Sequence, residues 1–278
     1  MPELPEVELI SRSLNTLVKG RTIKSAELLR TRLAPDSPPA SFAESLADKR
    51  INHVHRRGKH ILFDLSGETT LIAHLRMSGR FSLLPTDREL PKFTHAVFHL
   101  ADESRLVFDD QRHFGLMKIV STDRLYEAKE LKKLAPEPFS DEFSPTYFQN
   151  TLKASKRNLK EVLIDQTKVC GVGNIYASEA LFAAGIFPGM RADKLPKNGA
   201  ERLRQSIIAV LGEAVSYAEP LDIDPENLEG NYFSGSDDPT WYVYDREGEP
   251  CRNCEAPILR LKQSGRSTYY CPQCQSRL

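Results

Sequence analysis

The stretch CRNCEAPILRLKQSGRSTYYCPQC, residues 251–274, decides the fold at the C-terminal end of this 278-residue chain. It holds four of the five cysteines, as two CxxC pairs with sixteen residues between them: Cys251, Cys254, Cys271 and Cys274. Two such pairs present four thiolates to a single tetrahedral ion, which is the arrangement of structural zinc sites. The sequence therefore predicts one structural Zn²⁺ at this end of the chain.

The residues between the two cysteine pairs predict a β-hairpin. Two short runs that can form strands, 258–261 and 267–270, flank a turn at 263–265 that contains glycine. A segment this small cannot bury enough core by itself, so the metal would provide its folding energy. Disulfides are the alternative, but the acidic start PELPE does not resemble a signal peptide and favours a cytoplasmic protein with reduced thiols. We expect Cys170, the fifth cysteine, to be a buried thiol.

Upstream of the hairpin the pattern is helical. Residues 218–240 are acidic and rich in Gly, Ser and Asp, which is typical of a loop. Before them, apolar spacing predicts four helices, over residues 145–152, 158–165, 174–184 and 200–217. Pro136, Pro138 and Pro145 indicate a linker in front of this helical region.

A short glycine motif, Gly171-Val172-Gly173-Asn174, immediately precedes one of these helices. Backbone N–H groups at a helix N-terminus suit a phosphate group, although such a motif is also common in a plain turn. The basic run at 153–160, which includes Lys156, favours a contact with a DNA backbone.

The N-terminal half has a different pattern. Residues 3–18 have helical apolar spacing and are followed by Gly20, whereas residues 22–120 show short strands separated by turns. Many short strands predict a β-sandwich or barrel. The chain as a whole therefore indicates an α+β protein of more than one domain.

Composition excludes a transmembrane helix, and the distribution of charge indicates what kind of molecule the protein binds. The chain is 40% hydrophobic and 27% charged, has 38 basic and 38 acidic residues, and contains no apolar run of about 18 residues. The charges are segregated, with basic runs at 49–60, 153–160 and 260–266. Such runs indicate a nucleic-acid-binding face, or else solvated charge scattered by chance.

The first eight residues, MPELPEVE, carry candidate chemistry. Removal of Met1 would leave Pro2 as a secondary amine that is partly neutral near pH 7 and can form an iminium with a sugar C1′. Glu3 and Glu6 are then close enough in sequence to move protons. A frayed terminus without function is the alternative.

Five segments together resemble a known family. They are PELPEVE (2–8), HLRMSG (74–79), DDQRHFG (109–115), GVGNIYASEALFAAGI (171–186) and the cysteine hairpin. In this order they are similar to bacterial formamidopyrimidine-DNA glycosylase. The resemblance implies a monomer that binds damaged double-stranded DNA in a cleft, excises oxidised purines and then nicks the strand as an AP lyase. It also implies an N-terminal helix on a β-sandwich (1–135), a helix-two-turn-helix domain with a lesion loop (136–235) and a zinc-finger hairpin (236–278).

The resemblance also implies roles for single residues. Pro2 would be the nucleophile, Glu3 the proton shuttle that opens the sugar, and Glu6 a supporting carboxylate. Lys59 would donate a proton for β-elimination, and Arg266 would assist δ-elimination and bind phosphate. Further DNA contacts are expected from Met77, His95, Arg112, Phe114, Lys156 and Asn174.

Met77, Arg112 and Phe114 match the family's set that fills the hole left by a flipped base. An apolar wedge compensates for lost stacking, and an arginine can hydrogen-bond the orphaned partner base, which we expect to be cytosine. Base extrusion is needed because C1′ cannot be attacked inside the stack. Without the resemblance, Met77 and Phe114 would be read as ordinary core residues.

The chain departs from the family pattern at 218–240, where an acidic stretch stands in place of the usual lesion loop, and at Phe93, Gln111 and His113. Two alternatives remain, of which the atypical stretch at 218–240 favours the first, whereas the presence of Pro2, Glu3 and Lys59 argues against the second. One is an endonuclease VIII-like enzyme for oxidised pyrimidines, and the other is a binder of damaged DNA without catalysis.

Overall fold

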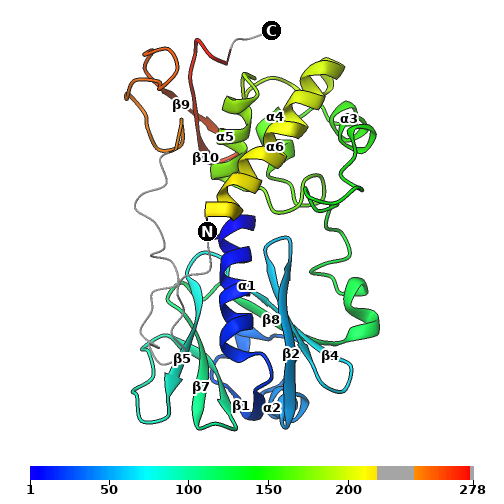
Figure 1. Ribbon diagram of the computed structural model, residues 1–278, viewed down its shortest axis with the longest axis vertical. Coiled ribbons are helices and arrows are strands. Elements are labelled where there is room, and N and C mark those ends of the chain that lie inside the picture. Colours follow the sequence, from blue (N-terminus) through cyan, green and yellow to red (C-terminus); the bar gives the residue numbers. More distant parts are fainter. Residues whose placement is uncertain (218–240, 276–278) are drawn as a thin grey trace. The chain divides into compact units, whose positions relative to one another are not determined.

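The computed structural model describes residues 1–217 and 241–275, which form two compact units (Figure 1). Unit 1 contains Met1–Lys132, and unit 2 contains residues 133–217 and 241–275. The loop that we expected at 218–240 lies outside the described residues. Within the described ranges, none of the helices combines the length and apolarity needed to cross a membrane.

Unit 1 is built from a long helix, a sheet and short helical segments. In chain order these are α1 (Leu4–Val18), β1 (Thr22–Leu28), η1 (Thr31–Leu33), α2 (Pro39–Leu46), β2 (Lys49–Arg57), β3 (His60–Leu65), β4 (Thr69–His74), β5 (Gly79–Pro85), β6 (Thr94–Leu100), β7 (Ser104–Asp110), β8 (Leu116–Ser121) and η2 (Thr122–Glu127). The helix expected over residues 3–18 is confirmed as α1, and short strands occupy much of residues 22–120, as expected.

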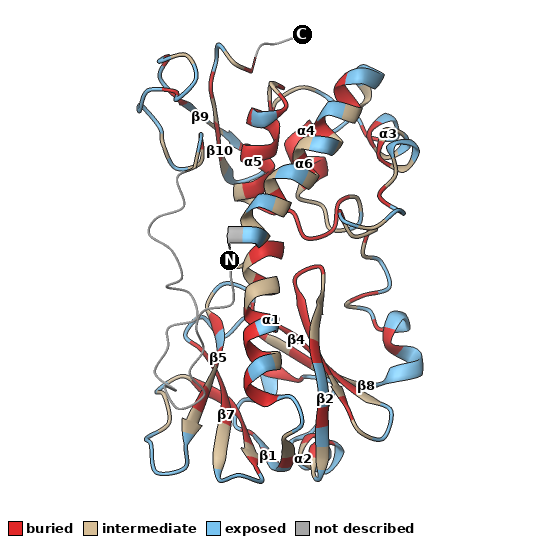
Figure 2. Cartoon of the chain, viewed as in Figure 1, coloured by how far each residue is buried: buried red, intermediate tan, exposed pale blue. Residues whose placement is uncertain are grey.

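The eight strands follow the order β5-β7-β6-β1-β2-β3-β4-β8, with antiparallel pairing throughout. β1 and β2 pair over only two residue pairs, so the sheet divides there into two halves of four strands. Phe63 on β3 meets Phe81 on β5 with ring centroids 5.3 Å apart, so side chains of the two halves pack face to face. The interior between them is buried (Figure 2), which confirms the expected sandwich.

Helix α1 packs its apolar side against β2 and β3. Val7, Ile10 and Leu14 recur at helical spacing and are at most 5% exposed. The side-chain oxygen of Asn15 accepts the backbone N–H of Val54 on β2 at 2.9 Å, which fixes the helix along that strand. α1 therefore holds the N-terminus of the chain on the sandwich.

The expectation that residues 22–120 form only strands was wrong at α2. Pro39 begins this helix, where its missing N–H costs nothing. Phe42 and Leu46, four residues apart, are fully buried, and Phe42 packs against Phe98 with ring centroids 6.1 Å apart. A two-turn helix offers too few apolar repeats to stand out from strand alternation in the sequence.

Unit 2 begins with helices. They are α3 (Pro145–Lys153), α4 (Leu159–Leu163), α5 (Asn174–Ala183), η3 (Ala192–Lys194) and α6 (Lys197–Tyr217). All four expected helices are present, although α4 is shorter than predicted and α6 begins three residues earlier. Pro145, which we assigned to the linker as well, is the first residue of α3, and Ser144 caps it by accepting the N–H of Tyr147.

The C-terminal hairpin is confirmed as β9 (Leu259–Gln263) and β10 (Arg266–Tyr270). Its turn consists of Ser264 and Gly265, both with positive φ (45° and 76°), as a tight two-residue hairpin turn requires. Glu179 on α5 anchors the chain that leads into the hairpin, because its carboxylate accepts the N–H groups of Tyr242, Val243 and Tyr244 at 2.9–3.0 Å.

Candidate active site and nucleic-acid interface

The start of α1 positions the two N-terminal glutamates. Glu3 is the N-cap residue and is only 2% exposed, and Pro2 directly precedes it. Glu3 and Glu6 form a reciprocal capping box, in which the Glu6 carboxylate accepts the N–H of Glu3 at 2.7 Å. The same contacts that begin the helix therefore fix a buried carboxylate next to the residue predicted as the nucleophile.

An ion pair fixes the second turn of α1 to the end of β2. Arg56 Nε lies 2.6 Å from one oxygen of Glu8, and the other oxygen binds Arg12 at 2.7 Å. Three residues after Arg56, the β2–β3 turn at Gly58 (φ +59°) carries Lys59, which is 4% exposed. The structure thus places Lys59 in unit 1 with Pro2, Glu3 and Glu6, and the Glu8–Arg56 pair connects the elements that carry them.

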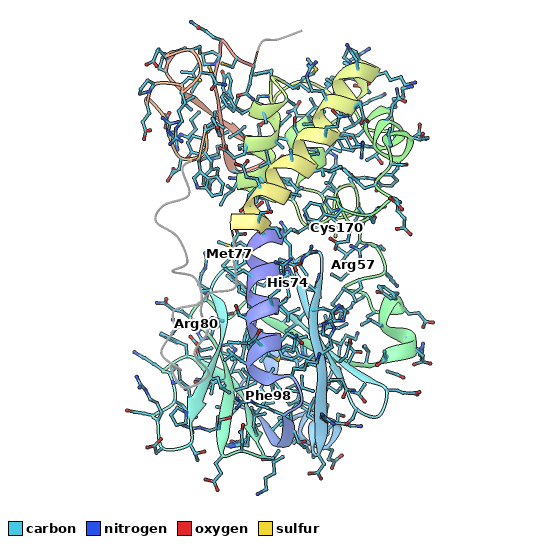
Figure 3. All side chains as sticks on the ribbon, viewed as in Figure 1. Arg57, His74, Met77, Arg80, Phe98 and Cys170 are labelled. Atoms are coloured by element: carbon cyan, nitrogen blue, oxygen red, sulfur yellow. The ribbon has the colours of Figure 1, made fainter. Side chains whose placement is uncertain are left out.

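The turn between β4 and β5 presents Met77 to solvent, with 43% of its surface exposed. The turn begins at His74, whose Nδ1 accepts the backbone N–H of Arg76 (φ +56°) at 3.0 Å. It ends at Gly79, where a Cβ atom would lie 2.6 Å from the carbonyl oxygen of Leu75, so only glycine fits. Figure 3 labels His74 and Met77.

His74 packs against a second buried histidine. The rings of His60 and His74 meet edge to face, 4.6 Å between centroids, and each residue is less than 10% exposed. Burial lowers the pKa of His60 to about 4 and the pKa of His74 to about 2, and the nearby charges of Arg76 and Lys59 act in the same direction. Both imidazoles are therefore neutral at physiological pH, which the acceptor role of His74 Nδ1 requires.

The turn between β7 and β8 carries Arg112 and Phe114, both exposed, with Phe114 at 48%. The guanidinium of Arg112 lies 5.6 Å from the centroid of the Phe114 ring. The exposure of Met77 and Phe114 overturns their reading as core residues. Both are large apolar side chains on turns, which suits a wedge that enters a base stack.

Buried Asp110 connects the two turns. Its Oδ1 accepts the hydroxyl of Ser78 at 2.5 Å and the N–H of Arg112 at 3.1 Å, and its Oδ2 accepts the N–H of Gly115 at 2.6 Å. Burial raises the pKa of Asp110, but these hydrogen bonds lower it overall, so the carboxylate is charged. Asp110 thereby holds the Met77 turn and the Arg112–Phe114 turn in one arrangement, a role that sequence reasoning missed.

His95 is 2% exposed, and its Nε2 lies 2.9 Å from Nδ1 of His113 and 3.1 Å from the carbonyl oxygen of Asp110. Burial, the largest cause, lowers the pKa of His95. The structure thus places His95, which we expected to contact DNA, in the interior of unit 1, where it contacts the exposed residue His113.

In unit 2, the glycine motif forms a tight loop in front of α5. The side chain of Gln166 holds it by donating to the carbonyl of Val172 at 2.8 Å and accepting the N–H of Gly171 (φ +80°) at 2.9 Å. Gly173 is the N-cap, and Asn174 is the first helical residue, as the predicted range 174–184 requires. Asn174 therefore lies at the N-terminal end of the ten-residue helix α5, where backbone N–H groups are not used within the helix.

Two side chains bind the hairpin at the same carbonyl group. Asn174 Nδ2 and Lys160 Nζ both donate to the carbonyl oxygen of Ser267, at 3.1 and 2.9 Å, and Lys160 also reaches the hydroxyl of Thr268 at 2.9 Å. Lys160 is 1% exposed and was missed from the sequence, because a lysine in a basic run suggests a solvated charge.

The exposed Arg266 directly precedes Ser267 on β10. The two shared bonds to Ser267 therefore bring Arg266 close to Asn174. Lys156 is exposed in the connection between α3 and α4. Arg266 and Lys156 give unit 2 two exposed cations, which are suitable partners for phosphate groups, whereas Asn174 is half-buried and its Oδ1 is buried.

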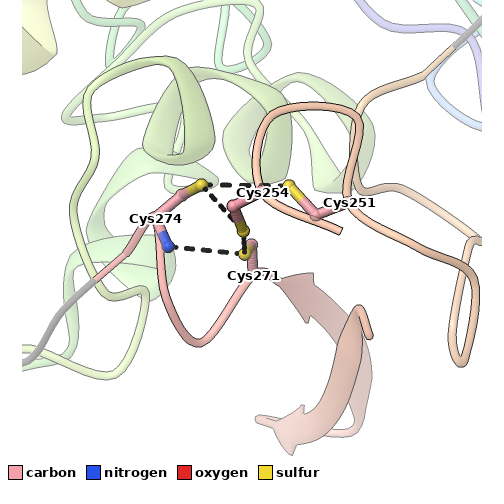
Figure 4. Close-up of side chains that lie close together, drawn as sticks. All are labelled: Cys251, Cys254, Cys271 and Cys274. Atoms are coloured by element: carbon pink, nitrogen blue, oxygen red, sulfur yellow. Dashed lines mark hydrogen bonds between the residues drawn. The ribbon is translucent and has the colours of Figure 1, made fainter. Parts of the chain in front are cut away.

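The four hairpin cysteines converge on one point (Figure 4). Sulfur–sulfur distances are 3.8 Å for Cys251–Cys274, 3.4 Å for Cys254–Cys271 and 3.5 Å for Cys254–Cys274. Zinc–sulfur bonds of about 2.3 Å place tetrahedral thiolates about 3.8 Å apart, whereas a disulfide needs about 2.05 Å. The backbone N–H groups of Asn253 and Cys274 also donate to sulfur. None of the five cysteines forms a disulfide, and Cys170 is buried, as expected. The tetrad therefore fits one structural Zn²⁺.

Comparisons with known families match three successive parts of the chain. Residues 1–117 match the formamidopyrimidine-DNA glycosylase N-terminal domain, residues 134–220 match its H2TH domain, and residues 248–277 match the zinc finger found in this glycosylase and in IleRS. The formamidopyrimidine-DNA glycosylase of Heliobacterium modesticaldum is 41% identical over 278 residues and covers 99% of this chain and 100% of its own. That of Bacillus licheniformis is 39% identical and covers 100% of both.

Solved structures agree with these matches. The Lactococcus lactis enzyme in complex with DNA that contains an abasic site is 33% identical, with a TM-score of 0.89, and the comparison covers 99% of this chain and 100% of that one. The same enzyme in complex with DNA that contains FAPY-dG has the same identity, TM-score and coverage. Together with the cysteine tetrad and the capping box of Glu3 and Glu6, these matches show that the chain belongs to the formamidopyrimidine-DNA glycosylase family.

Proposed function

We propose that this protein is a bifunctional DNA glycosylase and AP lyase of base excision repair, which excises oxidised purines such as 8-oxoguanine and formamidopyrimidines. The observation that carries this proposal is the full-length match to formamidopyrimidine-DNA glycosylases, including a structure with FAPY-dG DNA. The alternative that prefers oxidised pyrimidines is not favoured, because the relatives from Heliobacterium modesticaldum and Bacillus licheniformis are formamidopyrimidine-DNA glycosylases.

The nitrogen of Pro2, freed by removal of Met1, attacks C1′ of the damaged nucleotide. The C1′–N bond to the base breaks, and the base leaves with that electron pair and takes up a proton. Glu3 moves the proton that opens the sugar ring, and Glu6 supports it. The burial of Glu3 beside Pro2 supports these roles, because a fixed carboxylate at the nucleophile can transfer protons without first being ordered.

The iminium formed between Pro2 and C1′ acidifies the C2′ proton. Loss of that proton breaks the bond from C3′ to the 3′ phosphate oxygen, with Lys59 assigned as proton donor. A second elimination breaks the bond from C5′ to the 5′ phosphate oxygen, with Arg266 assigned to assist. The product is a one-nucleotide gap. Zn²⁺ takes no part in these steps and stabilises the hairpin through its four cysteines.

We assign Met77, Arg112 and Phe114 to the space that the extruded nucleotide leaves. Their exposure on two turns tied by Asp110 supports this assignment. Lys156 and Asn174 are assigned to phosphate groups, and His95 supports this set through His113. The domain limits that we propose are 1–135, 136–235 and 236–278. The enzyme acts as a monomer in the bacterial cytoplasm, on damaged double-stranded DNA of the nucleoid.

Borohydride trapping tests the proposal directly, because it reduces the iminium to a stable covalent adduct. Protein that starts at Pro2 is incubated with duplexes that carry 8-oxoguanine, formamidopyrimidine, 5-hydroxyuracil or an abasic site opposite cytosine. We expect adducts with both purine lesions and with the abasic site, and none from Pro2→Gly. Adducts only with 5-hydroxyuracil and the abasic site would reassign the lesion class, and no adduct at all would leave a DNA binder without catalysis.

Base excision and strand cleavage, the two activities that we assign to the N-terminus, can be separated by a substitution. Glu3→Gln removes the carboxylate that opens the sugar, so we expect it to abolish excision of 8-oxoguanine while leaving much of the cleavage at preformed abasic sites. The matched control is Glu27→Gln, at an exposed glutamate on β1. Normal base excision by Glu3→Gln would contradict the role assigned to Glu3.

A further inference from the structure

Two histidines and an aspartate meet on strands β2 and β3, outside the residues assigned to DNA. The ligand atoms of His53, His55 and Asp64 all lie within 4.8 Å of one another. His53 and His55 are two residues apart on β2, and their rings stack with centroids 5.1 Å apart. The antiparallel register places His53 opposite Asp64, the one residue of β3 that is not buried. Three metal-binding side chains therefore share one face of two adjacent strands.

The spacing within this cluster suits a metal ion. His55 Nε2 lies 3.1 Å from Asp64 Oδ2. Two ligand atoms at about 2.0–2.2 Å from a tetrahedral ion are about 3.4 Å apart, and in octahedral geometry about 3.0 Å. The His55–Asp64 pair thus needs almost no movement to share an ion. The exposed ring of His53 can close on the same ion by rotation about its own side-chain bonds.

The neighbouring strand orients the carboxylate. Thr70 on β4, opposite Asp64 in the register, is fully buried and donates its hydroxyl to Asp64 Oδ1 at 3.4 Å. Thr70 is held in turn by Thr122, at 2.9 Å between hydroxyl oxygens. Such outer contacts fix a ligating carboxylate and direct its other oxygen to the ion.

We propose that His53, His55 and Asp64 form a second metal site, which binds a divalent transition ion such as Ni²⁺, Cu²⁺ or Zn²⁺. Two imidazoles and one carboxylate suit these ions, whereas Mg²⁺ and Ca²⁺ prefer a set of oxygen ligands. Three ligands from the protein leave coordination positions open to water. The bound ion is therefore exchangeable, unlike an ion enclosed by four thiolates.

Two other histidine contacts provide matched controls. His99 pairs with Glu27 across β6 and β1, with Nε2 and Oε1 2.6 Å apart, which offers one imidazole and one carboxylate. His95 pairs with His113, which offers two imidazoles. Within the described ranges, only the cysteine tetrad and the His53–His55–Asp64 cluster join three or more potential ligands.

The test is a titration of the zinc-loaded full chain with Ni²⁺, by calorimetry and by NMR of the histidine ring protons. We expect one equivalent of Ni²⁺ to bind while the zinc content stays at one per chain. Paramagnetic Ni²⁺ should broaden the His53 and His55 signals first and leave the His99 signals sharp. His53→Gln and His55→Gln should each weaken Ni²⁺ binding by at least about tenfold, whereas His99→Gln should not change it.

Two results would overturn the proposal. One is the absence of any Ni²⁺ equivalent in the wild type. The other is binding that survives both His53→Gln and His55→Gln, above all if His113→Gln abolishes it. Because zinc content and the yield of borohydride adduct report on the fold and on the DNA site, a variant that keeps both but loses Ni²⁺ has lost a ligand and not its structure.

Discussion

His60 and His74 show how burial sets the chemistry of single residues in this enzyme. Their rings touch in the interior of unit 1, and the Nδ1 atom of His74 accepts the N–H of Arg76 at the start of the Met77 turn. A protonated imidazole donates at both nitrogens and cannot accept that bond. The position of an exposed apolar side chain thus depends on a buried histidine that stays neutral.

The lowered pKa values of this pair predict a pH dependence. An unfolded histidine takes up a proton near pH 6.5, whereas folded His60 does so only at about pH 4. Neutral His60 therefore makes its full contribution to the free energy of unfolding above pH 6.5. This contribution, on the order of 3 kcal/mol, is lost as the pH falls towards 4. In NMR titrations between pH 8 and 5.5, the ring signals of His60 and His74 should not shift. A midpoint near pH 6.5 for either residue would contradict this.

Residues that act through distant partners were the ones that sequence reasoning missed. Lys160 binds Ser267 across 107 positions of the chain, and Glu179 binds the backbone of residues 242–244. The spacing along one strand or helix cannot reveal such pairs, since they arise only when separate elements pack. The cysteine tetrad was predictable because a CxxC pair is a local signal that survives any tertiary arrangement.

At the scale of elements, the sandwich, the hairpin and the four helices of unit 2 were predictable from periodicity and turn residues. The two-turn helix α2 was not, because its identity depends on Phe42 packing against Phe98 of β6. Tertiary contacts decide short elements, whereas long periodic ones are decided by their own sequence.

The hydrogen bonds of Asp110 predict that the Met77 turn and the Arg112–Phe114 turn act as one unit. Asp110→Asn replaces one carboxylate oxygen with an N–H group, so that a donor would face the N–H of Gly115 or of Arg112. Loss of hydrogen bonds to a charged group costs about 1.5–3 kcal/mol. We expect excision of 8-oxoguanine to slow by at least about tenfold, mainly in kcat, and a fluorescent base at the lesion position to report less extrusion.

Asp109→Asn is the matched control for this variant. Asp109 is the preceding residue of β7 and binds Arg80 at 2.7 Å, with no bond to either turn. It should keep near-normal kcat. Equal loss in the two variants would mean that Asp110 acts on the stability of β7 and not on the two turns.

The zinc hairpin is an element whose fold depends on its metal. Cys271→Ser should lose zinc and DNA affinity together, because Arg266 and the Ser267 carbonyl are positioned by the same hairpin. Zinc content and a DNA-binding titration measure the two effects. Cys170→Ser, at a buried thiol outside the tetrad, should change neither. Tight DNA binding by zinc-free Cys271→Ser would show that the hairpin does not contact DNA.

At the scale of the whole molecule, zero net charge conceals a strongly uneven distribution. Basic residues gather at 49–60, 153–160 and 260–266, and the acidic residues lie elsewhere. The cations that the proposal assigns to DNA are Lys59, Arg112, Lys156 and Arg266. Binding to a polyanion depends on these local groups and on the counterions that they displace, so net charge does not determine it.

Salt dependence tests this distribution. Each phosphate that a cation neutralises contributes about −0.9 to the slope of log K against log [salt]. Because Arg112 is assigned to the orphaned base, Lys59, Lys156 and Arg266 remain for phosphate groups, and three such contacts predict a slope of about −3. Arg266→Gln should make the slope shallower by about 0.9 and weaken binding to damaged and undamaged duplexes alike. Arg124→Gln, at an exposed arginine paired with Glu127 on η2, should leave the slope unchanged. A wild-type slope near zero would mean that base and wedge contacts, and not phosphate contacts, determine the affinity.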